Sequence, residues 1–167
     1  MRRKLFAGLL IAAPSAAWCG PIADQFGSGY EGVTWGLRLA DLVGMMPGGD
    51  HYWSTAPGKR VYVVKNDAPL FGVPREGTRV QYHLGKDGGV EHIAIGVPYE
   101  RREQVLSSLN LQFGGYVAHD FGPATCYMWG EDRQVRLSLC VSRDPRYGIA
   151  EVWINHVSGA TPKRNGK

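Results

Sequence analysis

The sequence lacks the motifs that mark the common hydrolases and nucleotide-binding proteins. It contains no Gly-x-Ser-x-Gly, no His-Glu-x-x-His and no glycine-rich phosphate-binding loop. Its carboxylates are scattered, and no two of them are paired for acid–base chemistry. These absences argue against an enzyme, so we expect no catalytic residues and no cofactor.

A run of basic residues is also missing. The chain has 19 Lys and Arg against 15 Asp and Glu. Six of the basic residues lie at the two ends, as Arg2, Arg3 and Lys4 and as Lys163, Arg164 and Lys167, so the region between them is slightly acidic. A nucleic-acid-binding surface needs clustered basic residues, and we therefore expect no nucleic-acid partner.

No apolar stretch after residue 17 is long enough to span a bilayer. The first 17 residues combine a basic start (Met1–Lys4), an uncharged apolar run (Leu5–Ala13) and small residues (Pro14–Ala17). This layout predicts a signal peptide that is removed near residues 17–19. The protein is therefore expected to be periplasmic or secreted.

Cys19 offers an alternative fate. Cleavage directly before a cysteine leads to lipidation, and the product would be an outer-membrane lipoprotein anchored at Cys19. Trp18 fits poorly at the position before such a cleavage. We therefore favour ordinary cleavage, and we expect membrane contact only if Cys19 is lipidated.

Glycine is abundant, with 23 residues, and aromatic residues make up 11% of the chain, which together with short β-branched runs predicts a sheet-rich fold. The segment Gly32–Arg38 (GVTWGLR) resembles Gly96–Arg102 (GVPYERR), and each leads into a helical pattern. We expect an α+β fold of two tandem helix-plus-antiparallel-sheet units in one compact domain. The units would span residues 20–97 and 98–157, followed by a flexible polar tail at 158–167.

Two alternating segments, Val80–Leu84 and Val135–Leu139, predict half-buried strands. A two-residue turn at Asp87-Gly88 would place Tyr82 opposite Ile93 on one apolar face, in agreement with the hydrophobic pattern. Further strands are expected at 51–54, 60–65, 93–95 and 152–154.

A register that pairs Cys126 with Cys140 places Tyr127 and Trp129 on the same face as the leucines of the neighbouring strand. In an exported protein this pairing predicts a cross-strand disulfide between Cys126 and Cys140. Two buried thiols are the alternative. A Cys126 nucleophile assisted by His156 is also conceivable, although the disulfide explains both cysteines more simply.

The hairpin register also places His83 opposite His92 on the face away from the apolar residues. Two imidazoles at this spacing could reach one metal ion, but zinc needs further ligands and the sequence supplies none nearby. We therefore expect no metal, and two histidines on a sheet surface remain the simpler interpretation. A proton-sensitive contact with a partner is an alternative.

Aromatic side chains and one apolar loop indicate binding to another protein. The loop Asn66–Gly77 carries Leu70 and Phe71, which either pack under their own domain or are offered to a partner. Tyrosine and tryptophan are well suited to anchor an interface. The candidate partner-binding residues are Trp35, Trp53, Leu70, Phe71, Tyr116 and Trp153.

Three features form a pattern over residues 32–156. They are the GVTWGLR segment before the first helix, its GVPY counterpart before the second, and the pair Cys126 and Cys140. This pattern resembles the secreted β-lactamase-inhibitor proteins and the small outer-membrane assembly lipoproteins of the same fold group. The resemblance implies a concave, aromatic-lined sheet that binds a protein and performs no turnover. We therefore expect an exported inhibitor or immunity protein that occludes a toxin or cell-wall hydrolase. An envelope assembly lipoprotein anchored at Cys19, or a small envelope hydrolase using His83, His92 or Cys126, are the alternatives.

Overall fold

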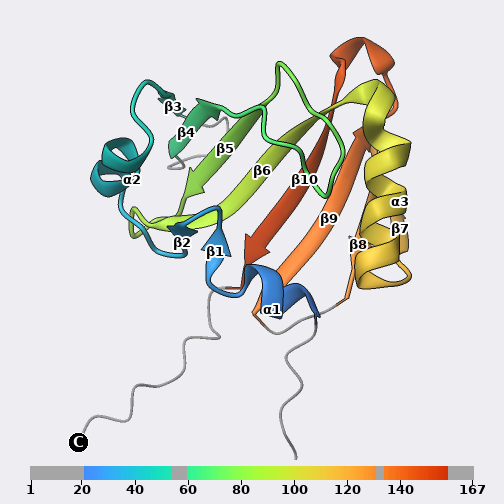
Figure 1. Cartoon of the computed structure of the whole chain (residues 1–167), viewed down its shortest axis with the longest axis horizontal. Coiled ribbons are helices and arrows are strands. Elements are labelled where there is room, and N and C mark those ends of the chain that lie inside the picture. Colours follow the sequence, from blue (N-terminus) through green and yellow to red (C-terminus); the bar gives the residue numbers. More distant parts are fainter. Residues whose placement is uncertain (1–20, 54–59, 131–133, 158–167) are drawn as a thin grey trace, which may run out of the picture.

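The computed structural model describes residues 21–53, 60–130 and 134–157 (Figure 1). The predicted signal peptide, Cys19 and the tail at 158–167 lie outside these residues. In chain order, the elements are α1 (Pro21–Phe26), β1 (Gly29–Tyr30), β2 (Val33–Thr34), α2 (Leu39–Met45), β3 (Asp50–Trp53), β4 (Arg60–Lys65), β5 (Arg79–Leu84), β6 (Val90–Pro98), η1 (Tyr99–Arg101), α3 (Arg102–Phe113), β7 (Val117–Asp120), β8 (Ala124–Trp129), β9 (Val135–Ser142), η2 (Pro145–Tyr147) and β10 (Ile149–His156).

Most of the strands belong to one antiparallel sheet of eight, in the order β3-β4-β5-β6-β10-β9-β8-β7. Strands β3 to β6 are neighbours in sequence order, as are β7 to β10, and the two runs meet where β6 pairs with β10. Strands β1 and β2 form a separate pair. The predicted α+β class is confirmed.

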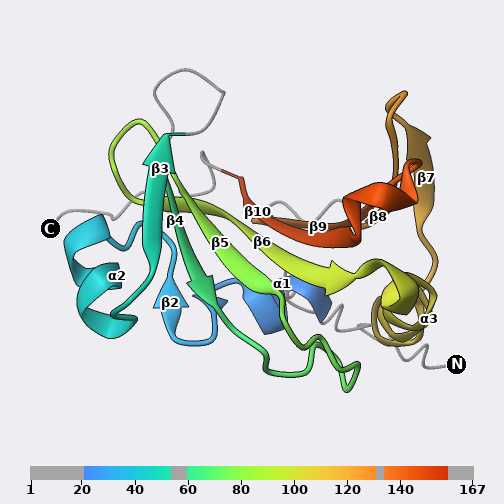
Figure 2. The ribbon, with the colours of Figure 1, turned by 90° about the horizontal axis from the view of Figure 1, so that it is seen from above.

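The two faces of the large sheet have different surroundings. On one face, Val80 and Tyr82 of β5 lie opposite Ile95 and Ile93 of β6, and all four side chains are buried. Figure 2 shows all three α-helices on one side of the sheet, and the sheet curves away from them toward its edge strands β3 and β7. We call the side opposite the α-helices the open face, because no α-helix of the described chain covers it.

The helices contribute apolar side chains to the core between themselves and the sheet. Leu42 of α2 and Val105 and Leu109 of α3 are fully buried, and removing such surface from water is the main favourable term in folding. The helix predicted after the segment Gly96–Arg102 is confirmed as α3, which ends at Phe113 and has Gly114, with φ 82°, as its C-cap. None of the helices among the described residues is long and apolar enough to cross a membrane.

The predicted strand register between β5 and β6 is confirmed, but the predicted two-residue turn is wrong. Tyr82 lies opposite Ile93, as expected. The turn instead spans Gly85 to Gly88, where the Gly88 amide donates to the Gly85 carbonyl, and Gly85 pairs with Gly89. Gly88 has φ 81°, which glycine adopts without strain. A bulge in the ladder then shifts the pairing by one residue and restores the register.

The predicted pairing of β8 with β9 is confirmed. Cys126 lies opposite Cys140, and their sulfurs form a disulfide. Tyr127 and Trp129 lie opposite Leu139 and Leu137 on the face covered by the helices. The disulfide therefore lies on the open face.

Candidate binding face of the sheet

A chain of hydrogen bonds crosses the centre of the open face. The Tyr52 hydroxyl of β3 donates to Gln81 Oε1 of β5 at 2.9 Å, and Gln81 Nε2 donates to Glu151 Oε1 of β10 at 2.9 Å. The Trp153 indole N–H donates to Glu151 Oε2 at 3.1 Å. This chain, which we call the open-face network, fixes side chains from three strands relative to one another.

Small residues on β6 make the open-face network possible. Strand β6 lies between β5 and β10, and on the open face it presents Ala94 opposite Gln81 and Gly96 opposite Glu151. Neither residue has a side chain large enough to block contact between the side chains of β5 and β10. The Gln81 amide therefore reaches across β6 to the Glu151 carboxylate.

Burial changes the acidity of two groups in the open-face network. It raises the pKa of the Glu151 carboxyl above its ordinary value, although the hydrogen bonds from Trp153 and Gln81 oppose the shift. Burial also raises the pKa of the Tyr52 hydroxyl, and the nearby Glu151 charge adds to this effect. Glu151 is thus a partly buried carboxylate whose ionised form is stabilised by hydrogen bonds from two neutral donors.

The two histidines of the hairpin lie beside this network. His83 and His92 face each other across β5 and β6, as predicted. The His83 ring lies 5.0 Å from the Trp153 ring, and His92 Nε2 lies 3.8 Å from Glu91 Oε2. Within the described residues, no group of three or more His, Cys, Asp or Glu side chains is arranged to hold a metal ion.

An open depression of about 510 Å³ adjoins the network at the N-terminal end of β10. Its walls include Ala124 of β8, Cys140 and Ser142 of β9, Ile149 of β10 and Tyr147 of η2. Glu151 also lines this depression. The volume is within the range of about 300–1,000 Å³ that is typical of ligand pockets.

Cys126 and His156, which could together have formed a nucleophilic pair, have other contacts. Cys126 is engaged in the disulfide. His156 lies opposite Val135 and stacks on Trp35, with ring centroids 5.4 Å apart. The two side chains belong to opposite faces of the sheet.

Three of the predicted partner-binding residues pack on the helix side of the sheet. Leu70 is buried at 3% exposure, and Phe71 packs edge-on against Phe26 and Phe113. Trp35 is partly buried, and its indole donates to the Phe26 carbonyl at 2.8 Å. Of the two alternatives for the apolar loop, the structure has the one in which the loop packs under its own domain.

The other three candidates have accessible surface. Trp53, on edge strand β3, is 64% exposed and stacks with the Arg60 guanidinium at 4.7 Å. Tyr116 is 39% exposed and meets Tyr127 edge-on. Trp153, half-buried in the open-face network, is the candidate that lies on the open face near the centre of the sheet.

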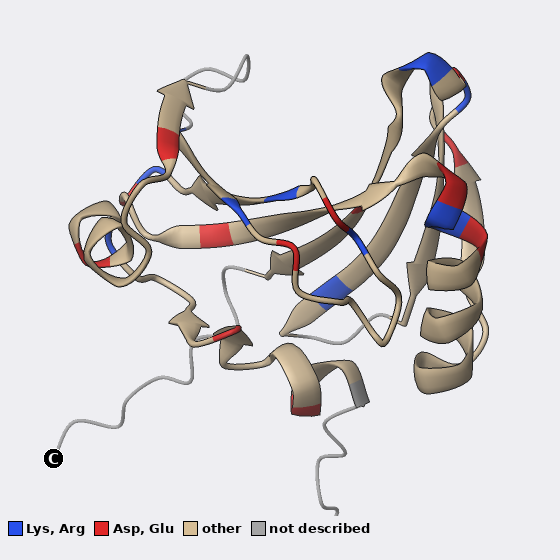
Figure 3. Cartoon of the chain, turned by 45° about the horizontal axis from the view of Figure 1, so that its top comes forward, with Lys and Arg blue, Asp and Glu red and all other residues tan. Residues whose placement is uncertain are grey.

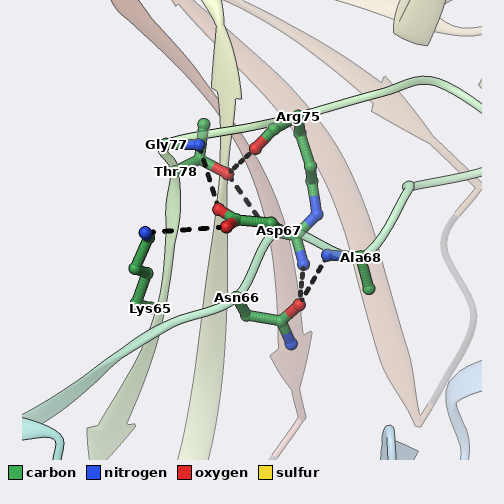
Figure 4. Close-up of polar contacts among 7 residues, drawn as sticks. All are labelled: Lys65, Asn66, Asp67, Ala68, Arg75, Gly77 and Thr78. Carbon is green, nitrogen blue, oxygen red and sulfur yellow. Dashed lines mark hydrogen bonds and ion pairs between the residues drawn. The ribbon is translucent and has the colours of Figure 1, made fainter.

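A second polar cluster lies in the loop between β4 and β5 (Figure 4). Arg75 is buried at 1% exposure, and its guanidinium donates to Asn66 Oδ1 at 2.9 Å and to Thr78 Oγ1 at 3.2 Å. Asp67 accepts from the Gly77 amide at 2.9 Å and lies 3.7 Å from Lys65 Nζ. We call this group the Arg75 cluster, and its bonds close the loop on itself.

Charges of both signs are interspersed along the described chain (Figure 3). At the η2 end, Arg143 pairs with Asp120, and Arg146 Nη2 lies 2.6 Å from Asp144 Oδ2. The backbone hydrogen bond from Gly122, followed by the contact with Arg143, lowers the pKa of Asp120. The side-chain contact with Arg146, followed by that residue's backbone amide, lowers the pKa of Asp144. Arg143 and Arg146 thus each have an acidic partner.

Sequence reasoning missed Tyr52, Gln81 and Glu151 as parts of one site. The available signal was the alternation in Ile93–Val97, where bulky residues on one face alternate with Ala94 and Gly96 on the other. That pattern indicates that side chains of the two neighbouring strands can contact each other across this strand. It does not reveal that β10 would become the neighbour of β6.

Comparison with protein-family models, with curated proteins and with solved structures gave no match.

Proposed function

We propose that the protein is an exported, non-enzymatic binding module that attaches to another envelope or secreted protein through the open face. The observation that carries this proposal is the sheet face that no α-helix of the described chain covers. On this face, Tyr52, Gln81, Glu151 and Trp153 are held in place by mutual hydrogen bonds. Side chains that are already ordered lose little conformational entropy on binding, which favours affinity.

The proposed mechanism is steric occlusion. The partner would be a secreted toxin or a cell-wall hydrolase, and the curved sheet would cover its cleft. Trp153 would provide a rigid central anchor, while Tyr52, which is 47% exposed on the edge strand β3, would contact the rim. Aromatic and hydrogen-bonding groups around a partly apolar centre are the usual composition of such interfaces.

We also propose that the chain consists of two tandem units. Support comes from the strand order, in which each run of four strands is continuous in sequence and the runs abut at β6 and β10. The GVTWGLR segment ends directly before α2, and the GVPYERR segment runs from the end of β6 through η1 to the first residue of α3. This arrangement is the one expected for a duplicated helix-plus-sheet unit, and it does not distinguish an inhibitor from an envelope assembly protein.

The test is capture of envelope proteins on the purified protein, with salt varied and bound proteins identified by mass spectrometry. We expect one stoichiometric partner that survives high salt, because an aromatic interface is less sensitive to screening than ion pairs. The partner's enzymatic or toxic activity should fall as the complex forms. Binding without any loss of that activity would contradict occlusion.

Two matched variants identify the face that binds. Ile149→Arg places a charge on the open face, where Ile149 is 45% exposed. Leu111→Arg places the same charge on α3, where Leu111 is 90% exposed. We expect Ile149→Arg to abolish capture and Leu111→Arg to leave it unchanged; the reverse pattern, or no partner at any salt concentration, would refute the proposal.

A further inference from the structure

The depression at the N-terminal end of β10 combines apolar walls with one carboxylate. Ala124, Ile149 and the ring of Tyr147 provide the apolar surface, and Glu151 provides the acidic group. Tyr147 is 73% exposed and Ile149 is 45% exposed, so neither is covered by the rest of the described chain. The site is therefore open to a group from another molecule.

The Glu151 carboxylate retains acceptor capacity. An ionised carboxylate has about four lone-pair sites, and the Gln81 amide and the Trp153 indole each occupy one. Both donors are neutral, and no Lys or Arg among the described residues forms an ion pair with Glu151.

Two arginines lie close in sequence to the residues that line the depression, and both already form ion pairs. Arg143 is matched by Asp120 and Arg146 by Asp144. Arg79 of β5 also lies on the open face, where its charge opposes the rise that burial causes in the pKa of Tyr52, but it forms no ion pair with Glu151. Among the described residues, Glu151 therefore has hydrogen-bond donors but no ion-pair partner. A partly buried carboxylate that lacks a cation favours a ligand that brings one.

We propose that this depression receives an arginine or lysine side chain of the partner protein, with Glu151 as its counter-ion. This inference rests on the proposed function and specifies the chemistry of the partner at one point. The aliphatic stem of the basic side chain would lie against Ile149 and Ala124. Its charged end would meet Glu151 Oε1 and Oε2, with the ring of Tyr147 placed to add a cation–π contact.

The test uses two small probes on the purified protein with its disulfide intact. Nα-acetyl-arginine methylamide carries the cation, and Nα-acetyl-citrulline methylamide is its neutral near-isostere. Binding is followed by NMR from the Trp153 indole N–H, assigned by its loss in Trp153→Phe. We expect the arginine probe to bind at least about tenfold more tightly than the citrulline probe.

Two variants test the role of Glu151. Glu151→Gln should reduce the preference for arginine to about onefold, and Ser142→Lys should do the same by placing a tethered cation in the depression while Glu151 is retained. Glu103→Gln is the matched control, because Glu103 is an exposed glutamate on α3, and it should keep the full preference. Near-ultraviolet circular dichroism checks that each variant is folded.

Equal binding of the two probes, no binding of either, or a preference that survives in Glu151→Gln would overturn the inference. These outcomes are distinct from failure of the proposed function, because the probes need no partner protein. Capture of a partner by wild type and Glu151→Gln with equal affinity would also overturn the inference, while it would leave the binding module intact.

Discussion

Glu151 in the open-face network and Arg75 in the loop between β4 and β5 are both charged groups held by neutral hydrogen-bond partners. Arg75 is 1% exposed, and its guanidinium donates to residues of its own loop. Glu151 is half-buried and lines an open depression. The two sites thus share a similar chemistry but differ in what can approach them.

The difference separates a structural role from a binding role. Withdrawing a charge from water is unfavourable unless new contacts offset the loss. For Arg75, the offset comes from within the fold, through Asn66 and Thr78, and the loop closes as a result. For Glu151, about two acceptor sites remain for an external cation. Its desolvation is therefore only partly offset within the fold, and a cation from a partner can offset the rest.

The largest effect is expected from removing the buried cation. Arg75→Ala takes a donor from Asn66 Oδ1 and Thr78 Oγ1 and leaves a cavity, so the free energy of unfolding should fall by about 3–5 kcal/mol. Chemical denaturation measures it. Arg79→Ala, which truncates an exposed arginine on the adjacent strand, should change it by no more than about 0.5 kcal/mol. Similar losses in both variants would show that the Arg75 cluster has no special structural role.

Loss of the disulfide should have the next largest effect. Replacing Cys126 and Cys140 together by alanine opens a link between residues 14 apart in sequence, which should lower the free energy of unfolding by about 3 kcal/mol. Because Cys140 lies opposite Glu151 and lines the depression, binding of the arginine probe should also weaken. Unchanged probe affinity in the double variant would show that the depression is independent of the cross-link.

Trp153→Phe sharpens the comparison at the carboxylate itself. The variant removes the indole N–H bond to Glu151 Oε2 and should lower the free energy of unfolding by about 1.5 kcal/mol. Since that bond favours the ionised form, the pKa of Glu151 should rise further, which NMR titration of the Glu151 carboxyl can follow. Trp53→Phe, which changes an exposed indole on β3, should leave this pKa unchanged; an equal response to both variants would argue against the assigned bond.

The smallest effect is the dependence of stability on pH. Burial raises the pKa of Glu151 in the folded state, so the folded protein takes up a proton at a higher pH than the unfolded chain. Relative to Glu151→Gln, the wild type should therefore gain stability as pH falls through the raised pKa, and this gain should level off below the ordinary pKa of glutamate. Denaturation series of both proteins at several pH values measure the difference. A difference that is constant with pH, or that changes in the opposite direction, would contradict the assignment.

Local patterns allowed part of the fold to be predicted. Alternating residues in Val80–Leu84 and Ile93–Ile95 specified both the strands and their register, because only one register buries Tyr82 with Ile93. The same logic paired Cys126 with Cys140. The turn between β5 and β6 was predicted wrongly, since glycines at positions 85, 88 and 89 permit more than one turn and the bulge that compensates for it has no clear sequence signal.

The sequence by itself determined the elements whose partners are close in the chain, because side-chain periodicity and turn residues act over short distances. Tertiary structure alone decided that β6 lies beside β10, and this pairing brings Gln81 and Glu151 together although they are 70 residues apart. It also decided that Leu70 faces the core and that the opposite face of the sheet carries no α-helix in the described chain. These outcomes depend on how all the apolar surfaces are buried at once, which is a property of the whole fold and not of any one segment.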